Sequence, residues 1–272
     1  MTASRIPDLF DRLKRDGRKA LMPFVCGGRP TIDALPDLLV ALERGGASIV
    51  EIGVPFSDPI ADGPVIAAAM HEALEDGVTP EQIFAQVAAA RDRVEMGLVA
   101  MVSISLVHRG GGPEAFTKRA AEAGFDGFIF PDAPMEESEA LIQASADVGL
   151  TASLLVAPTT PTDRAAEIAA RCTGFVYLLA RSGITGERAD APDVASAVAR
   201  LRESATTPVA VGFGISTSDH VCAVVEHADA AIVGSALVRR MEDAHRAGKD
   251  ACAAAEAFVR ELAGGLPTPA AS

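Results

Sequence analysis

The sequence predicts an α/β protein folded as a single (β/α)8 barrel, the architecture called a TIM barrel. Short apolar runs alternate with longer alanine-rich stretches along most of the chain. Several short runs are apolar without interruption, which is typical of parallel strands buried on both faces. The length of 272 residues also fits, because such a barrel commonly takes about 250 residues.

Eight segments have the composition of strands, and the runs at 127–130 and 175–179 are continuously apolar. Eight strand–helix repeats favour a closed parallel barrel. An open doubly wound sheet is the structural alternative. The predicted strands cover residues 21–26, 48–53, 97–103, 127–131, 152–156, 174–179, 208–212 and 229–233.

The stretches between the strands have helical composition, and several open with helix-start signals. Thr79 precedes Pro80, and Thr160 and Pro161 precede another helical stretch. Threonine caps a helix N-terminus, and proline fits the first turn. The predicted helices include residues 33–44, 80–94, 113–123 and 163–171.

Two further helices are expected outside the eightfold repeat. Residues 5–16 place Ile6, Leu9, Phe10 and Leu13 at helical spacing, which predicts a short helix covering the N-terminal mouth of the barrel. Residues 64–75 predict a helix inserted after the second strand. No internal boundary is visible, so residues 1–272 are expected to form one domain with a frayed tail at 265–272.

Composition excludes several classes of function. The formal charge of −13 disfavours nucleic-acid or anionic-membrane partners, because their phosphates would be repelled. The N-terminus lacks the apolar core of a signal peptide, and no apolar run is long enough to span a bilayer. The four scattered cysteines form no CxxC pair, which favours a reduced, cytoplasmic setting. The five histidines show no metal-ligand spacing, so no metal site is expected.

The most informative segment is residues 51–64, E-I-G-V-P-F-S-D-P-I-A-D-G-P. An apolar strand carries Glu51 and enters a proline-stiffened loop that carries Asp58 and Asp62. A carboxylate inside an apolar strand is costly to bury without a partner or a task. Two carboxylates on a restrained frame can divide acid and base work. The alternative is that Glu51 belongs to a buried polar network and Asp62 caps the following helix.

Glycines gather after three consecutive predicted strands near the C-terminal half. Backbone amides at such strand ends, with the N-terminus of a following helix, commonly bind phosphate in barrels. Turn glycines at strand ends are the alternative for each one taken alone. The candidates are Gly183 and Gly186, then Gly212 and Gly214, then Gly234 and Ser235.

The acidic segment resembles the signature of the tryptophan synthase alpha subunit family, E-x-G-x-P-F/Y-S-D-P-x-A-D-G-P. The likeness runs from about residue 23 to residue 239. It includes D-A-P-M-E-E at 132–137, Y-L-L-A-R-S-G-I-T-G at 177–186, G-F-G-I-S at 212–216 and V-G-S-A-L at 233–237.

The resemblance implies a lyase that cleaves indole-3-glycerol phosphate to indole and glyceraldehyde 3-phosphate, without metal or organic cofactor. It assigns the proton transfers to Glu51 and the indole N1–H hydrogen bond to Asp62. Thr185, in a lid at 181–186, would engage Asp62 on closure; an ordinary glycine-hinged loop is the alternative. It also implies a substrate site built from an indole wall and phosphate donors: Phe24, Met101, Ile129, Tyr177, Thr185, Gly186, Gly212, Phe213, Gly214, Gly234 and Ser235.

The resemblance further implies a beta subunit partner in an alpha-beta-beta-alpha heterotetramer, with Pro55 and Asp58 at interface positions. The chain departs from the family pattern at Arg29, Ser103, Ser105 and Pro131, where the family commonly has Asp or Tyr, Tyr, Asn and Ala. Three alternatives stay open. They are a free-standing lyase that releases indole, a sugar-phosphate isomerase barrel with similar phosphate loops, and a non-catalytic activator of a beta subunit.

Overall fold

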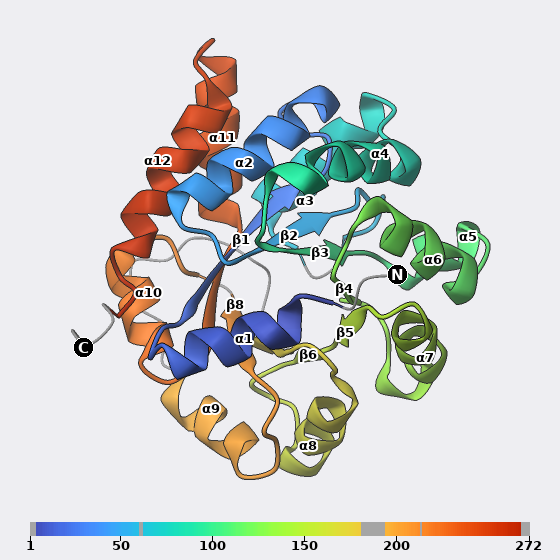
Figure 1. Ribbon diagram of the computed structural model, residues 1–272, viewed down its shortest axis with the longest axis vertical. Helices are drawn as coiled ribbons and strands as arrows, with labels where there is room; N and C mark the ends of the chain where they lie inside the picture. Colours follow the sequence, from blue (N-terminus) through green and yellow to red (C-terminus); the bar gives the residue numbers. More distant parts are fainter. Residues whose placement is uncertain (1–3, 60–61, 181–193, 213, 268–272) are drawn as a thin grey trace.

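A computed structural model of the chain describes residues 4–59, 62–180, 194–212 and 214–267. Within these ranges the strands form one parallel sheet in the order β5-β4-β3-β2-β1-β9-β8-β7-β6. Figure 1 shows the sheet curled at the centre with helices around it. The strands are β1 Ala20–Cys26, β2 Ile49–Gly53, β3 Gly97–Met101, β4 Gly127–Ile129, β5 Thr151–Ser153, β6 Leu155–Val156, β7 Val176–Leu179, β8 Val209–Gly212 and β9 Ala230–Val233.

The predicted barrel is confirmed, and the open-sheet alternative is wrong. The predicted strand at 152–156 is present as two short strands, with β5 paired to β4 and β6 paired to β7. The break falls at Leu154, whose carbonyl still accepts a hydrogen bond of 3.1 Å from the amide of Tyr177. The two pieces therefore act as one strand that joins the two ends of the sheet.

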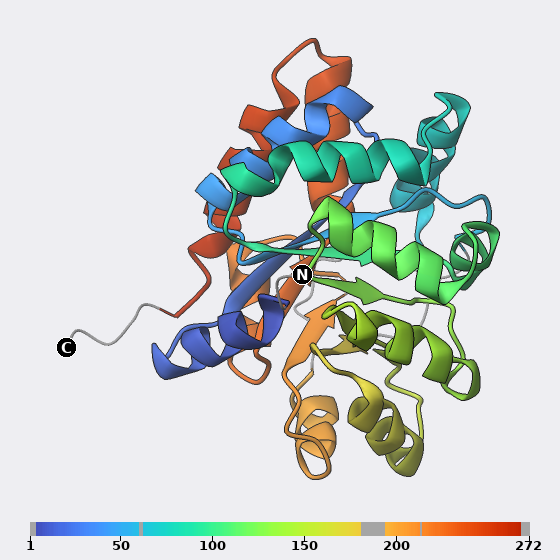
Figure 2. The same cartoon turned by 45° about the vertical axis from the view of Figure 1, so that its right-hand side comes forward.

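Helices follow most of the strands and cover the outside of the barrel (Figures 1 and 2). In both views α12 lies beside α2 and α11, and these helices are in contact. The described helices are α1 Ile6–Arg15, α2 Leu35–Gly45, α3 Pro64–Glu75, α4 Pro80–Ala90, α5 Ile104–Arg109, α6 Pro113–Ala123, α7 Glu139–Asp147, α8 Thr162–Arg171, α9 Ala195–Arg202, α10 Ser218–Val225, α11 Ser235–Arg246 and α12 Ala251–Ala263.

The predicted helix starts are largely confirmed. Thr79 caps α4, because its side chain accepts a hydrogen bond from the Gln82 amide and Gln82 reciprocates, a capping box. The predicted helix at 80–94 nevertheless ends at Ala90 and continues as a 3-10 turn, Arg91–Arg93. There the Arg91 guanidinium donates to the carbonyls of Val94 and Met96, which fixes the chain as it turns into β3.

Helix α1 covers the N-terminal end of the barrel, as expected. Its four apolar residues Ile6, Leu9, Phe10 and Leu13 are all buried. They contact residues that lie just before or at the start of strands: Ile6 packs on Gly97, and the Phe10 ring lies 6.2 Å from that of Phe175. The opposite, C-terminal end of the strands is therefore the end available for a site.

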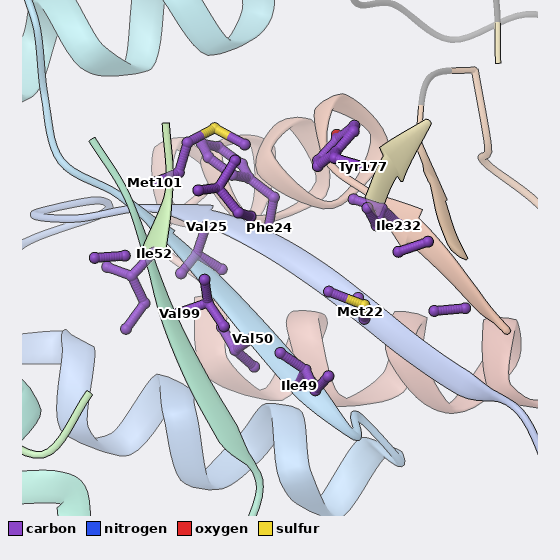
Figure 3. Packing of buried hydrophobic residues seen from close by; sticks show 14 of the residues in the cluster. Met22, Phe24, Val25, Ile49, Val50, Ile52, Val99, Met101, Tyr177 and Ile232 are labelled. Atoms are coloured by element: carbon purple, nitrogen blue, oxygen red, sulfur yellow. The ribbon is translucent and has the colours of Figure 1, made fainter. Parts of the chain in front are cut away.

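Figure 3 shows how the strand side chains divide within the core. Phe24 and Met101 lie side by side, with Tyr177 across from them and Met22 farther along β1. Phe24 and Met101 are buried near the C-terminal ends of their strands. The candidate indole residues therefore occupy the layer next to the open end of the barrel.

Two strand ends and one helix differ from expectation. The predicted strands at 97–103 and 127–131 end at Met101 and Ile129, and α5 begins at Ile104. Asp132 causes the early end, because it accepts hydrogen bonds from the Ser103 hydroxyl at 2.6 Å and from the Ile104 amide at 3.0 Å. The sequence V-S-I-S-L alternates like a strand, so the helix was not apparent.

No described helix combines the length and apolarity needed to cross a membrane. The single domain stays a prediction, supported by the single closed sheet. The predicted tail at 265–272 also stays a prediction. Its amides at Gly265 and Leu266 bond to the last turn of α12, while residues 268–272 lie outside the described part of the chain.

Candidate active site

Glu51 lies in the middle of β2 and is fully buried. Its Cα is in register with Phe24 of β1 and Val99 of β3. Neither carboxyl oxygen has a hydrogen-bond partner among the described residues, so the buried-network alternative has no support there. Burial, and then the nearby Asp62 carboxylate, raise the pKa of Glu51 well above its usual value. A buried carboxyl kept protonated near neutral pH can donate a proton.

Asp62 lies in the loop between β2 and α3, with its amide bonded to the Pro59 carbonyl at 3.0 Å. The N-cap residue of α3 is Gly63, so Asp62 does not occupy the cap position. Partial burial raises the pKa of Asp62 to about 6. Full burial of Glu51 and partial burial of Asp62 thus place the two carboxyls in different environments, which suits them for different tasks.

The apolar candidates Phe24, Met101, Ile129 and Tyr177 are all buried in the barrel. The Phe24 ring lies over Gly53, where an added Cβ would come within 2.5 Å of the ring. The absence of a side chain at Gly53 therefore leaves room for the Phe24 ring. Glu51 lies two residues earlier on the same strand, as the sequence pattern E-x-G requires. Phe213, a predicted wall residue, lies outside the described residues, as do Thr185 and Gly186.

Tyr177 connects the apolar wall to the acids. Its hydroxyl packs against Gly212 at the end of β8. Burial raises the pKa of Tyr177 well above its usual value, and the charges of Glu51 and Asp62 raise it further. The phenol is thus neutral and close to both carboxyls, where it can help to shape the site without adding charge.

A pocket of about 90 Å³ opens beside these residues. It includes Asp62 and Met101 together with two departures from the family pattern, Ser103 and Pro131. Glu51, Phe24, Ile129 and Tyr177 are buried and do not line it. The lining residues are Val54, Phe56, Asp58, Pro59, Asp62, Met70, Met101, Ser103, Pro131 and Asp132.

Phe56, Met70 and Asp132 belong to the pocket although the sequence assigned them no role. Asp132 had a usable signal, since it is a polar residue directly after an apolar strand, at the end where barrel sites form. Met70 had none, because a methionine on an amphipathic helix looks like ordinary core. The two predicted interface residues differ in exposure: Asp58 is exposed and accepts a hydrogen bond from Ser57, whereas Pro55 is buried.

The predicted phosphate donors follow the neighbouring strands β8 and β9. Helix α11 begins at Ser235 with Gly234 at its N-cap, and no side chain caps it. The first-turn amides of a helix have no intrahelical acceptor and carry partial positive charge, which suits an anion. Gly214 has φ +81°, a conformation that favours glycine. Gly212, Gly214, Gly234 and Ser235 therefore lie at the same end of adjacent strands.

Within the ranges that the structure describes, no group of three or more His, Cys, Asp or Glu side chains is arranged to hold a metal ion. The described cysteines Cys26, Cys172, Cys222 and Cys252 are all free thiols.

Comparison with known proteins identifies the family of the chain. The family model described as tryptophan synthase alpha chain matches residues 10–266. The tryptophan synthase alpha chain of Synechococcus sp. (strain CC9902) is 45% identical over 244 residues, covering 89% of this chain and 90% of that protein. That of Roseiflexus castenholzii is 42% identical over 262 residues, covering 96% of this chain and 100% of that protein.

Solved structures give the same result. Tryptophan synthase subunit alpha from Legionella pneumophila superposes with a TM-score of 0.89 at 30% identity, covering 97% of this chain and 98% of that one. A Mycobacterium tuberculosis tryptophan synthase chain gives 0.87 at 33% identity, with 97% and 98% covered. The chain therefore belongs to the tryptophan synthase alpha chain family.

Proposed function

We propose that this chain is the lyase subunit of a tryptophan synthase and cleaves indole-3-glycerol phosphate to indole and glyceraldehyde 3-phosphate. One observation carries the proposal. A fully buried Glu51 without a hydrogen-bond partner among the described residues lies near a second carboxyl, Asp62, at the open end of the barrel. Burying an unpaired carboxyl is costly. A role in proton transfer during a retro-aldol cleavage explains why the protein has a carboxyl at this position.

The proposed chemistry begins with protonated Glu51, which gives its proton to C3 of the indole ring. The ring becomes a cationic indolenine, and Asp62 stabilises that charge by accepting the hydrogen bond from N1–H. The C3–side-chain bond then breaks. Its electron pair returns to the ring, while the adjacent side-chain hydroxyl loses its proton and becomes the aldehyde carbonyl. Glu51 takes up that proton, so no net proton is consumed.

The rest of the site supports binding of the two ends of this substrate. Met101 lines the pocket, and the buried side chains of Phe24, Ile129 and Tyr177 are proposed to complete an apolar wall for the ring. The amides that begin α11, with the Ser235 hydroxyl, offer donors for the phosphate. Gly212 and Gly214 bring the backbone after β8 close to the same place. Thr185, Gly186 and Phe213 stay proposed substrate residues by resemblance alone.

The proposed partner is a beta subunit, in an alpha-beta-beta-alpha heterotetramer located in the cytoplasm. The proposed contact lies on the C-terminal end of the barrel, over Pro55, Asp58 and residues 105–112. Helix α5 and its hydrogen-bonded end at Gly110 and Gly112 make this segment an ordered surface. Charge and composition give no reason to expect a nucleic-acid or membrane partner.

The decisive experiment measures indole release by the isolated chain, with and without a beta subunit, beside Glu51→Gln. We expect release that the beta subunit stimulates and that Glu51→Gln abolishes. Release without stimulation would favour the free-standing lyase. Activation of the beta subunit without release would favour the non-catalytic activator. Turnover of a sugar phosphate in place of the indole substrate would favour an isomerase.

A further inference from the structure

Arg29 occupies the turn after β1, at one of the departures from the family pattern. Its guanidinium is nearly buried, with a side-chain exposure of 10%. Nε donates to Glu242 Oε1 at 2.9 Å and Nη2 donates to Oε2 at 2.7 Å, so both prongs hold one carboxylate. Such two-pronged pairs fix geometry as well as charge. Glu242 lies on α11, so Arg29 anchors the middle of that helix.

The same guanidinium also reaches α3. Nη2 lies 2.8 Å from Glu72 Oε2, and Nη1 lies 3.2 Å from Asp76 Oδ2. Arg246 of α11 reinforces the link, with Nη2 3.2 Å from Glu72 and 3.9 Å from Glu242. We call these five side chains the Arg29 clamp. The clamp ties the C-terminal half of α3 to α11.

These two helices carry opposite ends of the proposed site. Helix α3 starts at Pro64, two residues after Asp62, and α11 starts at Ser235. Near their starts the helices also meet, because a Cβ at Gly234 would lie 3.3 Å from Ile66 Cδ1 of α3. An apolar contact at the start and the clamp farther along thus set how α3 lies against α11.

The clamp is also close to the acids through the core. Cys26, at the end of β1, is buried. Burial raises the pKa of its thiol, and the charges of Arg29, Glu242 and Asp62 all act on it. Charges from both the clamp and the acidic loop therefore reach one buried side chain. A shift of α3 relative to α11 would move Asp62 relative to the phosphate donors.

We propose that Arg29 is a positioning residue: by clamping α3 to α11 it fixes the separation between Asp62 and the phosphate donors. The inference rests on the proposed function, because it assumes that one substrate touches both ends. A ligand that spans the site needs that separation to match its length. A ligand that occupies one end does not, so the two kinds of ligand respond differently when the clamp is cut.

The test compares two probes by calorimetric titration. Indole-3-propanol phosphate, the substrate without its hydroxyls, spans both ends; inorganic phosphate occupies one. The main variant is Glu72→Gln with Asp76→Asn, which releases α3 but leaves the Arg29–Glu242 pair intact, so no buried charge is orphaned. We expect the Kd of the spanning probe to rise about threefold to tenfold, and kcat/KM to fall in step, with the phosphate Kd unchanged.

Arg29→Met removes the central guanidinium of the clamp and leaves only the exposed Arg246–Glu72 pair between the two helices. It should raise the spanning-probe Kd by about tenfold or more. Arg29→Lys keeps one charge but not the two-pronged geometry, and should recover only part of the loss. If Arg29→Met folds poorly because Glu242 is left unpaired, Arg29→Met with Glu242→Met removes the orphaned charge. That double variant should regain stability while the spanning probe still binds weakly.

Two controls separate positioning from stability. Glu75→Gln changes an exposed carboxylate on α3 that pairs with His71. Arg91→Met removes an equally buried arginine, at 11% exposure, from Asp126 at the other end of the barrel. Neither should change the ratio of the two Kd values, although Arg91→Met should lower the melting temperature.

Two results would overturn the positioning role. One is an equal change in both Kd values in the clamp variants, and the other is a change in the Kd ratio in Arg91→Met as large as in the clamp variants. A wild-type chain that binds phosphate but neither binds the spanning probe nor releases indole would instead overturn the proposed function, and the positioning role with it.

Discussion

Glu51→Gln should stabilise the protein while abolishing cleavage, and the stability gain should depend on pH. The side chain is fully buried and has no hydrogen-bond partner among the described residues. Glutamine has nearly the same shape but cannot ionise. The variant therefore removes a titration and little else.

The size and sign of the effect follow from the raised pKa. In the unfolded chain Glu51 ionises around its ordinary pKa of 4.5, whereas the folded protein keeps it protonated to higher pH. Stability therefore falls as pH rises from 4.5 towards the folded pKa and is level beyond it. Each pH unit in this window costs about 1.4 kcal/mol. At pH 7 the gain in Glu51→Gln can thus reach about 3 kcal/mol, and below pH 4 it should vanish.

The assay is urea unfolding of both proteins at a series of pH values from 4 to 8. Glu75→Gln, at an exposed site on α3, has no burial to relieve and should leave stability unchanged. Three results would refute the reasoning: a destabilised Glu51→Gln protein, a gain of equal size at pH 4 and pH 8, or near-normal indole release.

Asp62→Asn should lower turnover by about 10²–10³-fold, or ~2.7–4 kcal/mol of barrier, because an amide cannot neutralise the developing cation; wild-type turnover would exclude the role. In the wild type, kcat/KM should fall as pH drops through the Asp62 pKa of about 6, since the carboxylate acts when ionised, and a flat acid limb would contradict this. Gly234→Asp should weaken inorganic phosphate binding at least about tenfold by like-charge repulsion, with Gly234→Ala as the smaller steric change; unchanged affinity in calorimetry would move the phosphate site elsewhere. Titration with a beta subunit should raise the cleavage rate, and Asp58→Lys should weaken the association. No activation and no association at micromolar concentrations would favour the free-standing lyase.

The barrel was predictable because its signals are repeated and redundant. Continuous apolar runs such as 127–130 are typical of strands buried on both faces. Eight strand segments alternating with helices leave few possible topologies. The helix at 113–123 was predicted to the residue, since Pro113 begins it and Gly124 ends it in the left-handed conformation. Glu51 was visible for the opposite reason, as the one charge inside an apolar strand.

Other features depend on contacts between segments far apart in sequence. The strand at 97–103 ends early because Asp132, about 30 residues away in the sequence, accepts a hydrogen bond from the backbone amide of Ile104. The break at Leu154 follows from the need of one strand to pair with two diverging neighbours. Arg29 looked like a departure of unknown effect, and its partner Glu242 lies 213 residues later. Local patterns carry no information about such pairings.

The placement of α1 limits how molecules travel through the protein. Its apolar side fills the space below the strands, and the barrel interior is occupied by side chains such as Met22 and Ile232 (Figure 3). A small molecule cannot pass along the barrel axis, so substrate must enter and product must leave at the C-terminal end of the strands. A protein that binds over that end of the barrel would therefore receive the released product directly, and no second passage through this chain would be needed.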